Sequence, residues 1–314
     1  MQPDRREFLL GSLAASMLST PALAALAPET MKGAPPPPLK GLIRKAYADS
    51  TWGQIHYRYV APKADAKKTP VVFFHPNPFS GAYFNYSMEE LGKDRMAIAF
   101  DSPGYGESAK PPKPQSMEAI CDAFGKALDN MGYGKGKKGQ VDVSGFHTGG
   151  YIAPELAAQR PDLVRRVVLS GVPFWEGERL DSKRKELLHE EPITEDGAFF
   201  ALEWKRWAAG RNKMLSIDRG LELAADAVIP GKDIWYAYYA VCNYEARKRF
   251  PLVKQPTYFV IPSGEEMQIT TRLAVPVFPN VKKVLEVPQL PHQIFDLAVD
   301  AVGQIYREFL DGPA

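Results

Sequence analysis

Two histidines lie in sequence settings that favour chemistry. His147 is at the centre of a turn bounded by Gly145 and Gly149, and His292 follows a short apolar run near the end of the chain. An imidazole has an ordinary pKa of about 6.5, so at neutral pH much of it is unprotonated and can act as a base or a nucleophile. Two imidazoles that lie close together oppose each other's protonation and titrate as a coupled pair. The two residues therefore predict acid–base or nucleophilic chemistry, provided that the fold brings them together.

The residues around His147 predict a strand, a tight bend and a helix. An apolar run begins at Val141, the bend is rich in glycine, and helix-period apolar residues follow from Ile152. This arrangement resembles the nucleophile elbow of α/β hydrolases, in which glycines allow a strained turn that lifts one side chain above the sheet. Members of that family usually carry Ser, Cys or Asp at the tip, where this chain carries His147. The resemblance implies that His147 occupies the nucleophile position.

An earlier loop resembles the part of the family fold that stabilises an oxyanion. The continuously apolar run 70–74 predicts a strand buried on both faces, and it leads into the loop 75–79. That loop is similar to the H-G-x-P loop of the family, with Pro76 in place of the usual glycine. Proline has no backbone N–H, so the donor available by position belongs to Asn77. The resemblance implies an oxyanion hole formed by the N–H groups of Asn77 and Thr148.

Two further features of these loops are predicted to be structural. The turn 101–108 closely matches the D-x-P-G-x-G-x-S turn of the same family, and it follows the apolar run 96–100. Asp101 and Ser108 are expected to satisfy backbone donors of this turn, without a catalytic role. His75 is expected to hold its own loop by a hydrogen bond.

The end of the chain supplies the base and the acid of the expected site. The strand-like run 284–287 leads into a loop that ends at His292, and it resembles the last strand and histidine loop of the family. The family commonly places the acid three residues past a glycine in an earlier loop, but a methionine holds that position here. Glu266, one residue earlier, is our predicted acid, with Glu265 and Glu176 as alternatives.

The motifs together imply an α/β fold of the α/β-hydrolase type. We expect a mostly parallel, twisted sheet with helices on both faces, and a helical cap inserted after strand 6. The predicted core comprises residues 41–173 and 251–314, and the predicted cap comprises residues 174–250. His56, in the opening hairpin, is expected on the strand surface. The cap is rich in aromatic residues, and a few of these are expected to line the substrate pocket: Phe199, Phe200, Trp204, Trp207, Trp235, Tyr236, Tyr238 and Tyr239.

The N-terminal region is predicted to direct export. Residues 1–24 resemble a twin-arginine signal peptide, with paired arginines, a modest apolar stretch and a small-residue cleavage site near Ala24. Residues 25–40 are rich in proline and predict an extended, poorly ordered linker. We therefore expect a periplasmic or secreted protein without stable membrane insertion, since no stretch is long and apolar enough to span a bilayer.

Charge, cysteine content and ligand spacing give no support for a nucleic-acid-binding protein, a disulfide-linked protein or a metalloprotein. The 39 basic and 37 acidic residues are mixed along the chain and give a net charge of +2, which does not favour a nucleic-acid partner. Cys121 and Cys242 lie far apart and are predicted to be small buried hydrophobic residues, not a disulfide. No cofactor is predicted. A metal site formed by His147, His292 and a glutamate lacks any sequential ligand spacing to support it.

Three functions remain open at this point. In the first, the protein hydrolyses an ester-like bond of a small apolar or aromatic substrate; His292 is the general base, and His147 is either a nucleophile or a group that orients water. In the second, the protein is a cofactor-independent dioxygenase or lyase, in which His147 binds the substrate. In the third, it is a ligand-binding protein without catalysis. Thr148 is a further possible nucleophile, but the elbow directs its side chain away from the site.

Overall fold

The computed structural model describes residues 33–62, 68–134 and 136–313. The predicted signal peptide, residues 1–24, lies outside the described residues. A single eight-stranded sheet forms the centre of the molecule, in the order β1-β2-β4-β3-β5-β6-β7-β8. β2 is antiparallel to both of its neighbours, β1 and β4, and all the other neighbouring pairs are parallel. The strands are β1 Arg44–Ser50, β2 Gly53–Val60, β3 Lys68–Phe74, β4 Arg95–Phe100, β5 Val141–Phe146, β6 Val164–Ser170, β7 Thr257–Pro262 and β8 Val281–Val287.

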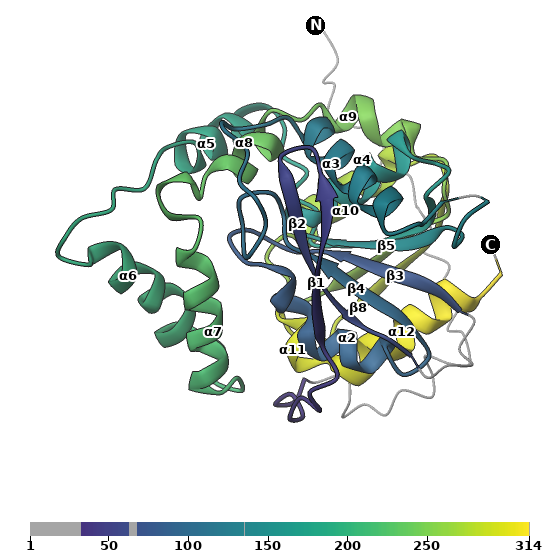
Figure 1. Ribbon diagram of the computed structural model, residues 1–314, viewed down its shortest axis with the longest axis horizontal. Helices are drawn as coiled ribbons and strands as arrows, with labels where there is room; N and C mark the ends of the chain where they lie inside the picture. Colours follow the sequence, from purple (N-terminus) through teal and green to yellow (C-terminus); the bar gives the residue numbers. More distant parts are fainter. Residues whose placement is uncertain (1–32, 63–67, 135, 314) are drawn as a thin grey trace, which may run out of the picture.

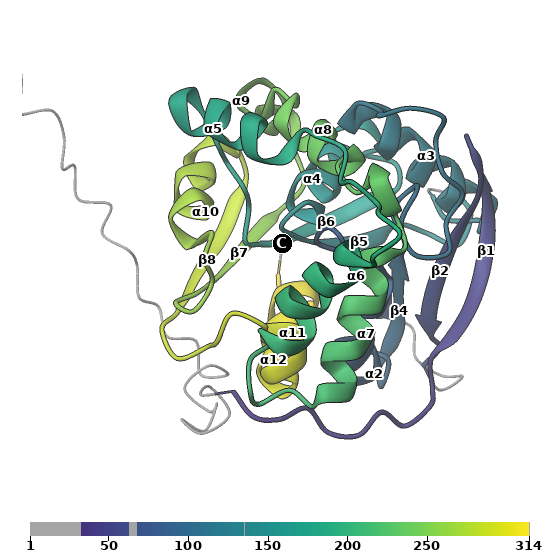
Figure 2. The same ribbon diagram turned by 90° about the vertical axis from the view of Figure 1, so that its left-hand side faces the viewer.

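Helices cover both faces of the sheet (Figure 2). Successive strand side chains point to opposite faces, so Phe73 joins the core beneath one helical layer and Phe74 the core beneath the other. The layer over Phe74 contains α3 Met117–Asn130 and α4 Gly149–Gln159, with α10 Gln268–Ala274 beside β7. The layer over Phe73 contains η2 Gly81–Phe84, α2 Asn85–Leu91, α11 Ile294–Leu297 and α12 Val299–Asp311. A short 3-10 turn, η6 Val275–Val277, follows α10.

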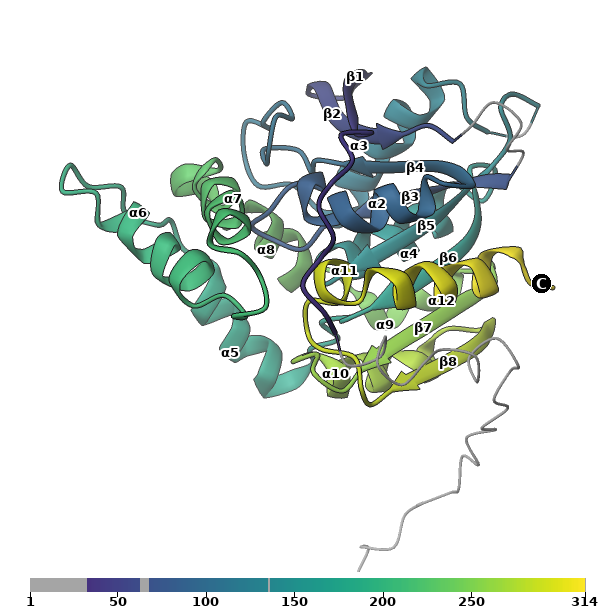
Figure 3. The same cartoon turned by 90° about the horizontal axis from the view of Figure 1, so that it is seen from below.

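A helical insertion separates β6 from β7, as predicted. Two of its helices, α6 and α7, stand away from the sheet (Figures 1 and 3). The division into core and cap at residues 174 and 250 stays a prediction. The helical segments are α5 Gly177–Leu187, α6 Ala198–Glu203, the π-helical η3 Trp204–Ala209, α7 Ile217–Val228, η4 Gly231–Asp233, α8 Tyr236–Cys242, α9 Ala246–Arg249 and η5 Phe250–Leu252.

Helix α7 is attached to the core by buried polar contacts. The Asp226 carboxylate accepts hydrogen bonds from the backbone N–H and the hydroxyl of Ser80, at 3.0 and 2.6 Å. The buried Arg219 guanidinium donates to the Tyr83 carbonyl and lies 3.1 Å from the Asp296 carboxylate. Because these groups lie out of water and depend on each other, they hold the insertion in place above the sheet.

The structure corrects two predictions about the start of the chain. Residues 33–40 are not a free tether, because the N–H of Ala34 donates to the Leu297 carbonyl at 2.7 Å and the N–H of Lys40 donates to Glu89 at 2.7 Å. Figure 3 shows this segment crossing the layer that contains α2 and α11. His56 is not on the surface: its ring is fully buried, and Nδ1 pairs with Asp101 at 2.7 Å.

The expected role of Asp101 and the burial of the two cysteines are confirmed. Asp101 accepts the backbone N–H groups of Gly81 and Glu107. Ser108 differs from the expectation, because its hydroxyl accepts the His56 N–H from outside the turn and donates to the Asp101 carbonyl. Cys121 and Cys242 are buried free thiols. Over the described residues, no helix has both the length and the hydropathy needed to cross a membrane.

Candidate active site

The elbow between β5 and α4 is as tight as the glycines predicted. A Cβ at Gly145 would lie 2.0 Å from the Gly149 carbonyl oxygen, and a Cβ at Gly149 would lie 1.9 Å from the Phe74 carbonyl oxygen. His147, at the tip, has a φ of +50°. An L-residue in this left-handed region costs about 1–2 kcal/mol. The surrounding backbone therefore holds His147 in an unfavourable conformation that projects it from the end of the sheet.

The His147 ring lies in a space that Gly171, a glycine outside the elbow, leaves open. A Cβ at Gly171, which follows β6, would approach Cδ2 of His147 to 2.6 Å. On another side the ring packs against Phe146, with ring centroids 4.2 Å apart. These contacts fix the imidazole, and its Nε2 lies 2.8 Å from Oε1 of Glu265. The sequence analysis did not identify Gly171, although its position directly after a buried strand was visible.

Glu265 connects the two histidines. Its residue is 1% exposed, Oε1 faces His147, and Oε2 lies 3.2 Å from Nδ1 of His292. Oε1 also accepts the Met267 N–H at 3.0 Å. Gly264 allows the close approach, because a Cβ there would lie 2.7 Å from the His292 backbone nitrogen. The loop after β7 and the His292 loop therefore pack directly against each other.

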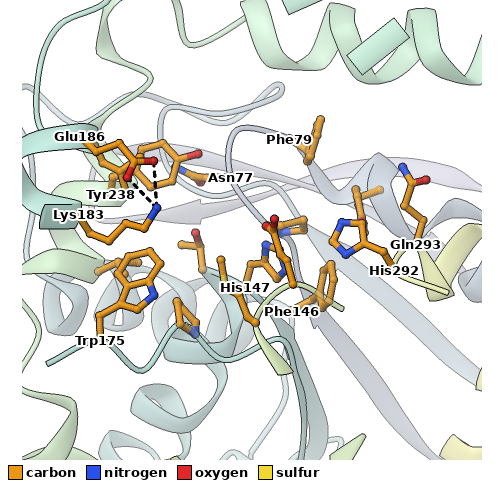
Figure 4. A pocket seen from close by; sticks show the side chains of 18 of the residues that line it. Asn77, Phe79, Phe146, His147, Trp175, Lys183, Glu186, Tyr238, His292 and Gln293 are labelled. Atoms are coloured by element: carbon orange, nitrogen blue, oxygen red, sulfur yellow. Dashed lines mark hydrogen bonds and ion pairs between the residues drawn. The ribbon is translucent and has the colours of Figure 1, made fainter. Parts of the chain in front are cut away.

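The structure brings the two predicted histidines together. Their ring centroids are 5.8 Å apart, and both rings line the same cavity (Figure 4). The side chain of His147 is 14% exposed and that of His292 is 40% exposed. His147 is thus the inner of the two groups, and His292 is the one more open to water and substrate.

The predicted acid is corrected from Glu266 to Glu265. The tight turn after β7, in which the Glu265 N–H donates to the Pro262 carbonyl, directs residue 265 inward. Glu266 instead lines the cavity wall. Glu176, the other alternative, is paired with Arg247 at 2.5 Å on the surface. Glu265 is one residue past Gly264, two fewer than the family spacing, so this turn selects the first glutamate of the pair.

Charge distribution in the cluster favours an ionised Glu265. Burial alone would raise the pKa of Glu265, but the two imidazoles outweigh it and hold this pKa well below the ordinary value. Burial would lower the pKa of His292, but the Glu265 carboxylate outweighs burial and raises it. Because a carboxylate only accepts hydrogen bonds, we assign protons to Nε2 of His147 and Nδ1 of His292. The opposite nitrogen of each ring then keeps its lone pair.

The predicted oxyanion donors also border the cavity. Asn77 and Thr148 both line it, and among the described residues neither backbone N–H donates to another group. The Asn77 side chain is held by the Tyr105 hydroxyl at 3.0 Å. His75 lies behind the loop, where Nδ1 contacts the Pro76 carbonyl and Nε2 accepts the Ser102 N–H, so the predicted structural role is confirmed.

The cavity has a volume of about 340 Å³ and a mixed lining. Of the aromatic residues expected from the insertion, Trp207 and Tyr238 reach it. Figure 4 shows a further polar wall on α5, where the Lys183 ammonium pairs with Glu186. Composition alone did not single out this pair. The aromatic lining residues are Phe79, Tyr83, Phe146, Trp175, Trp207 and Tyr238.

The arrangement can support two kinds of chemistry. A carboxylate, an imidazole with a free lone pair and two N–H donors can activate water and stabilise an oxyanion. Across the described residues, His147, Glu265 and His292 also form the one group of three whose donor atoms, all within 4.8 Å of one another, could hold a metal ion.

Comparison with known proteins decides the fold. Residues 69–209 match the family described as alpha/beta hydrolase fold. An enol-lactonase from Burkholderia xenovorans LB400 superposes with a TM-score of 0.67 at 18% identity, over 85% of this chain and 100% of that chain. The chain has the α/β-hydrolase fold. The fold class predicted from the four motifs is confirmed.

Curated relatives of this α/β-hydrolase-fold protein match shorter segments. The poly(3-hydroxyalkanoate) depolymerase of Ectopseudomonas oleovorans is 34% identical over 83 residues, which are 26% of this chain and 28% of the relative. The 2-hydroxymuconate semialdehyde hydrolase of Pseudomonas sp. strain CF600 is 34% identical over 120 residues, 36% of this chain and 41% of the relative. The chain thus spans less than half the length of either curated relative.

Proposed function

We propose that the protein is a hydrolase that cleaves an ester-like bond, an ester or a lactone, in a small apolar or aromatic substrate. One observation carries this proposal: a single buried carboxylate, Glu265, contacts the imidazoles of both His147 and His292 at the lining of one cavity. A base and two oxyanion donors then border the same space, and the orienting acid lies buried behind the base.

His292 acts as the general base in this mechanism. Its Nδ1 faces Glu265, so its Nε2 is the atom that takes a proton from water as the water attacks the acyl carbon. The N–H groups of Asn77 and Thr148 stabilise the oxyanion that forms. The imidazolium of His292 then returns its proton to the leaving oxygen, and Glu265 offsets its charge throughout.

His147 replaces the usual nucleophile without supplying a hydroxyl. Its Nε2 is engaged by Glu265, which leaves Nδ1 to accept a hydrogen bond from the attacking water. Direct attack by Nδ1 would break the acyl–oxygen bond and form an acyl-imidazole; the ring then loses its Nε2 proton, the leaving oxygen gains one and departs as the alcohol, and water must still cleave the acyl-imidazole. Both routes require the water that His292 activates, so the roles of His292 and Glu265 do not depend on the choice between them.

The cavity supports a small substrate with apolar surface. A volume of about 340 Å³ lies at the lower end of the range for small-molecule sites, and six aromatic side chains contribute to its walls. Two similar proteins, an enol-lactonase and a poly(3-hydroxyalkanoate) depolymerase, support an acyl–oxygen bond as the target.

A substrate panel tests the proposal. Aryl and alkyl esters, lactones and amides are incubated with the wild type and with His292→Ala, which controls for contaminating esterases. We expect turnover of esters or lactones by the wild type, and a loss of about 10²-fold or more in the variant. An acylated His147 peptide in mass spectra taken during turnover would select the covalent route. Failure of the wild type on every substrate would refute the proposed function.

A further inference from the structure

We propose that His147, Glu265 and His292 bind one divalent transition-metal ion. This inference goes beyond the proposed hydrolase function and does not rest on it. An ion on Nδ1 of His292 would leave the ring proton on Nε2, so the metal-bound form is a separate state from the one in which His292 acts as the base. The three side chains supply two imidazole nitrogens and a carboxylate, and their donor atoms lie within 4.8 Å of one another. Two histidines, one glutamate and an open fourth position are a ligand set that Zn²⁺ takes in catalytic sites.

The separations already approach those of a coordination shell. Ligands around a tetrahedral Zn²⁺, each about 2.0–2.1 Å from the ion, lie about 3.4 Å from one another. The two nitrogen–oxygen separations are 2.8 and 3.2 Å. The two contacts use different oxygens of Glu265, so the donor atoms, now within 4.8 Å of one another, must draw together around the ion. His292, whose side chain is 40% exposed, is the ligand with the most room to shift.

Unsatisfied atoms in the cluster point to a missing partner. Oε2 of Glu265 and Nδ1 of His292 are both buried, and within the described part of the chain neither makes a directed hydrogen bond, although the two atoms are 3.2 Å apart. In the metal-free site the N–H of His292 Nδ1 is thus poorly aligned with Oε2, and a bound ion would take the place of this proton. A buried carboxylate oxygen without a partner is costly, and a cation between these atoms would satisfy both.

The histidine at the elbow tip supplies a metal ligand that the usual serine would not. A serine hydroxyl at position 147 would be a poor ligand, whereas an imidazole is among the commonest ligands for divalent transition metals. Glu266, which also lines the cavity, adds negative charge near the cluster. The cavity that both rings border leaves room for a water molecule at the fourth position.

Metal binding can be measured without any substrate. Tag-free protein is dialysed against a chelator, then titrated with Zn²⁺ in competition with a chromophoric indicator, and separately with Cu²⁺ for electron paramagnetic resonance. We expect one site per chain and a Cu²⁺ spectrum with coupling to two imidazole nitrogens. His147→Ala and Glu265→Gln should each weaken Zn²⁺ binding about 100-fold or more, because each removes a ligand.

The controls keep the outcome decisive. His189, an exposed histidine outside the cavity, is replaced by alanine and should leave Zn²⁺ binding unchanged. Circular dichroism confirms that each variant is folded, and His147→Ser serves if the alanine variant is not. The proposal is overturned if the wild type binds no Zn²⁺, or if binding survives at full strength without His147. Ester turnover in the presence of chelator bears on the proposed function alone, so the two can fail separately.

Discussion

Replacing Glu265 by glutamine lowers kcat/KM for ester hydrolysis by about 10³-fold. Glutamine has nearly the shape of glutamate, so the packing of the loop after β7 is kept. The change removes the negative charge that faces both imidazoles, at 2.8 and 3.2 Å. It also places an N–H₂ donor where only an acceptor fits, which favours the wrong tautomer of His292 or His147. Steady-state kinetics on the best ester of the panel measures the effect.

Glu266→Gln is the matched control for this prediction. Glu266 is the adjacent residue, lines the cavity and undergoes the same loss of charge, but it does not contact the two imidazoles as Glu265 does. We expect its kcat/KM to fall less than about 10-fold, as for a charge removed from a solvated wall. Equal losses in the two variants would show that Glu265 has no special role.

The pH dependence follows from the direction of the two pKa shifts. His292 must be unprotonated to act as a base, so activity rises as pH increases through its pKa, which Glu265 raises. Without the carboxylate, burial dominates and the pKa of His292 falls, so Glu265→Gln moves the acid limb of kcat/KM to lower pH.

For folding, the raised pKa of His292 stabilises the protein below about pH 6.5, and this contribution is lost as pH rises through the folded pKa. The lowered pKa of Glu265 has the opposite sense: its contribution is lost in acid.

Gly171→Ala destabilises the protein and displaces the His147 ring. An alanine at a φ of +59° costs about 1–2 kcal/mol, and its Cβ would lie 2.6 Å from Cδ2 of His147 and 2.9 Å from Cε2 of Phe146. Overpacking of this kind costs about 1–3 kcal/mol more. We therefore expect the free energy of unfolding to fall by about 2–5 kcal/mol. We also expect kcat/KM to fall by about 10²-fold, since a shift of about 1 Å at a reacting group has that effect.

Gly177→Ala separates backbone strain from ring displacement. Gly177 also has a positive φ, +52°, but nothing lies within 4 Å of the position that its Cβ would take. Denaturant unfolding should show a loss of only about 1 kcal/mol, with activity almost unchanged. If the two alanine variants lose the same activity, the His147 ring does not depend on the space at Gly171.

Most of the sheet could be predicted because its strands are short, continuously apolar and bounded by recognisable loops. β3, β4, β5 and β7 lie buried in the middle of the sheet, and burial on both faces leaves a clear trace in the sequence. The glycines of the elbow could likewise be assigned a function. A Cβ at Gly145 or Gly149 would lie about 2 Å from a backbone oxygen, so only glycine fits at these positions.

Predictions that depended on contacts between distant segments were less accurate. The choice between Glu265 and Glu266 depends on how one tight turn packs against the His292 loop, and neighbouring glutamates look alike in the sequence. His56 follows the alternating pattern of an edge hairpin, but Asp101, 45 positions away, provides it with a buried partner at 2.7 Å. Residues 33–40 have the composition of a linker, yet two of their N–H groups bond to the core.

The central claim is that Glu265 and His292 work as one unit on the water that attacks the substrate. A double-mutant cycle tests it most directly: kcat/KM is measured for wild type, Glu265→Gln, His292→Ala and the double variant, with folding checked for each. Residues that act together are not additive, so the double variant should lose no more activity than the worse single variant. Losses that multiply, with each residue contributing independently of the other, would contradict the account.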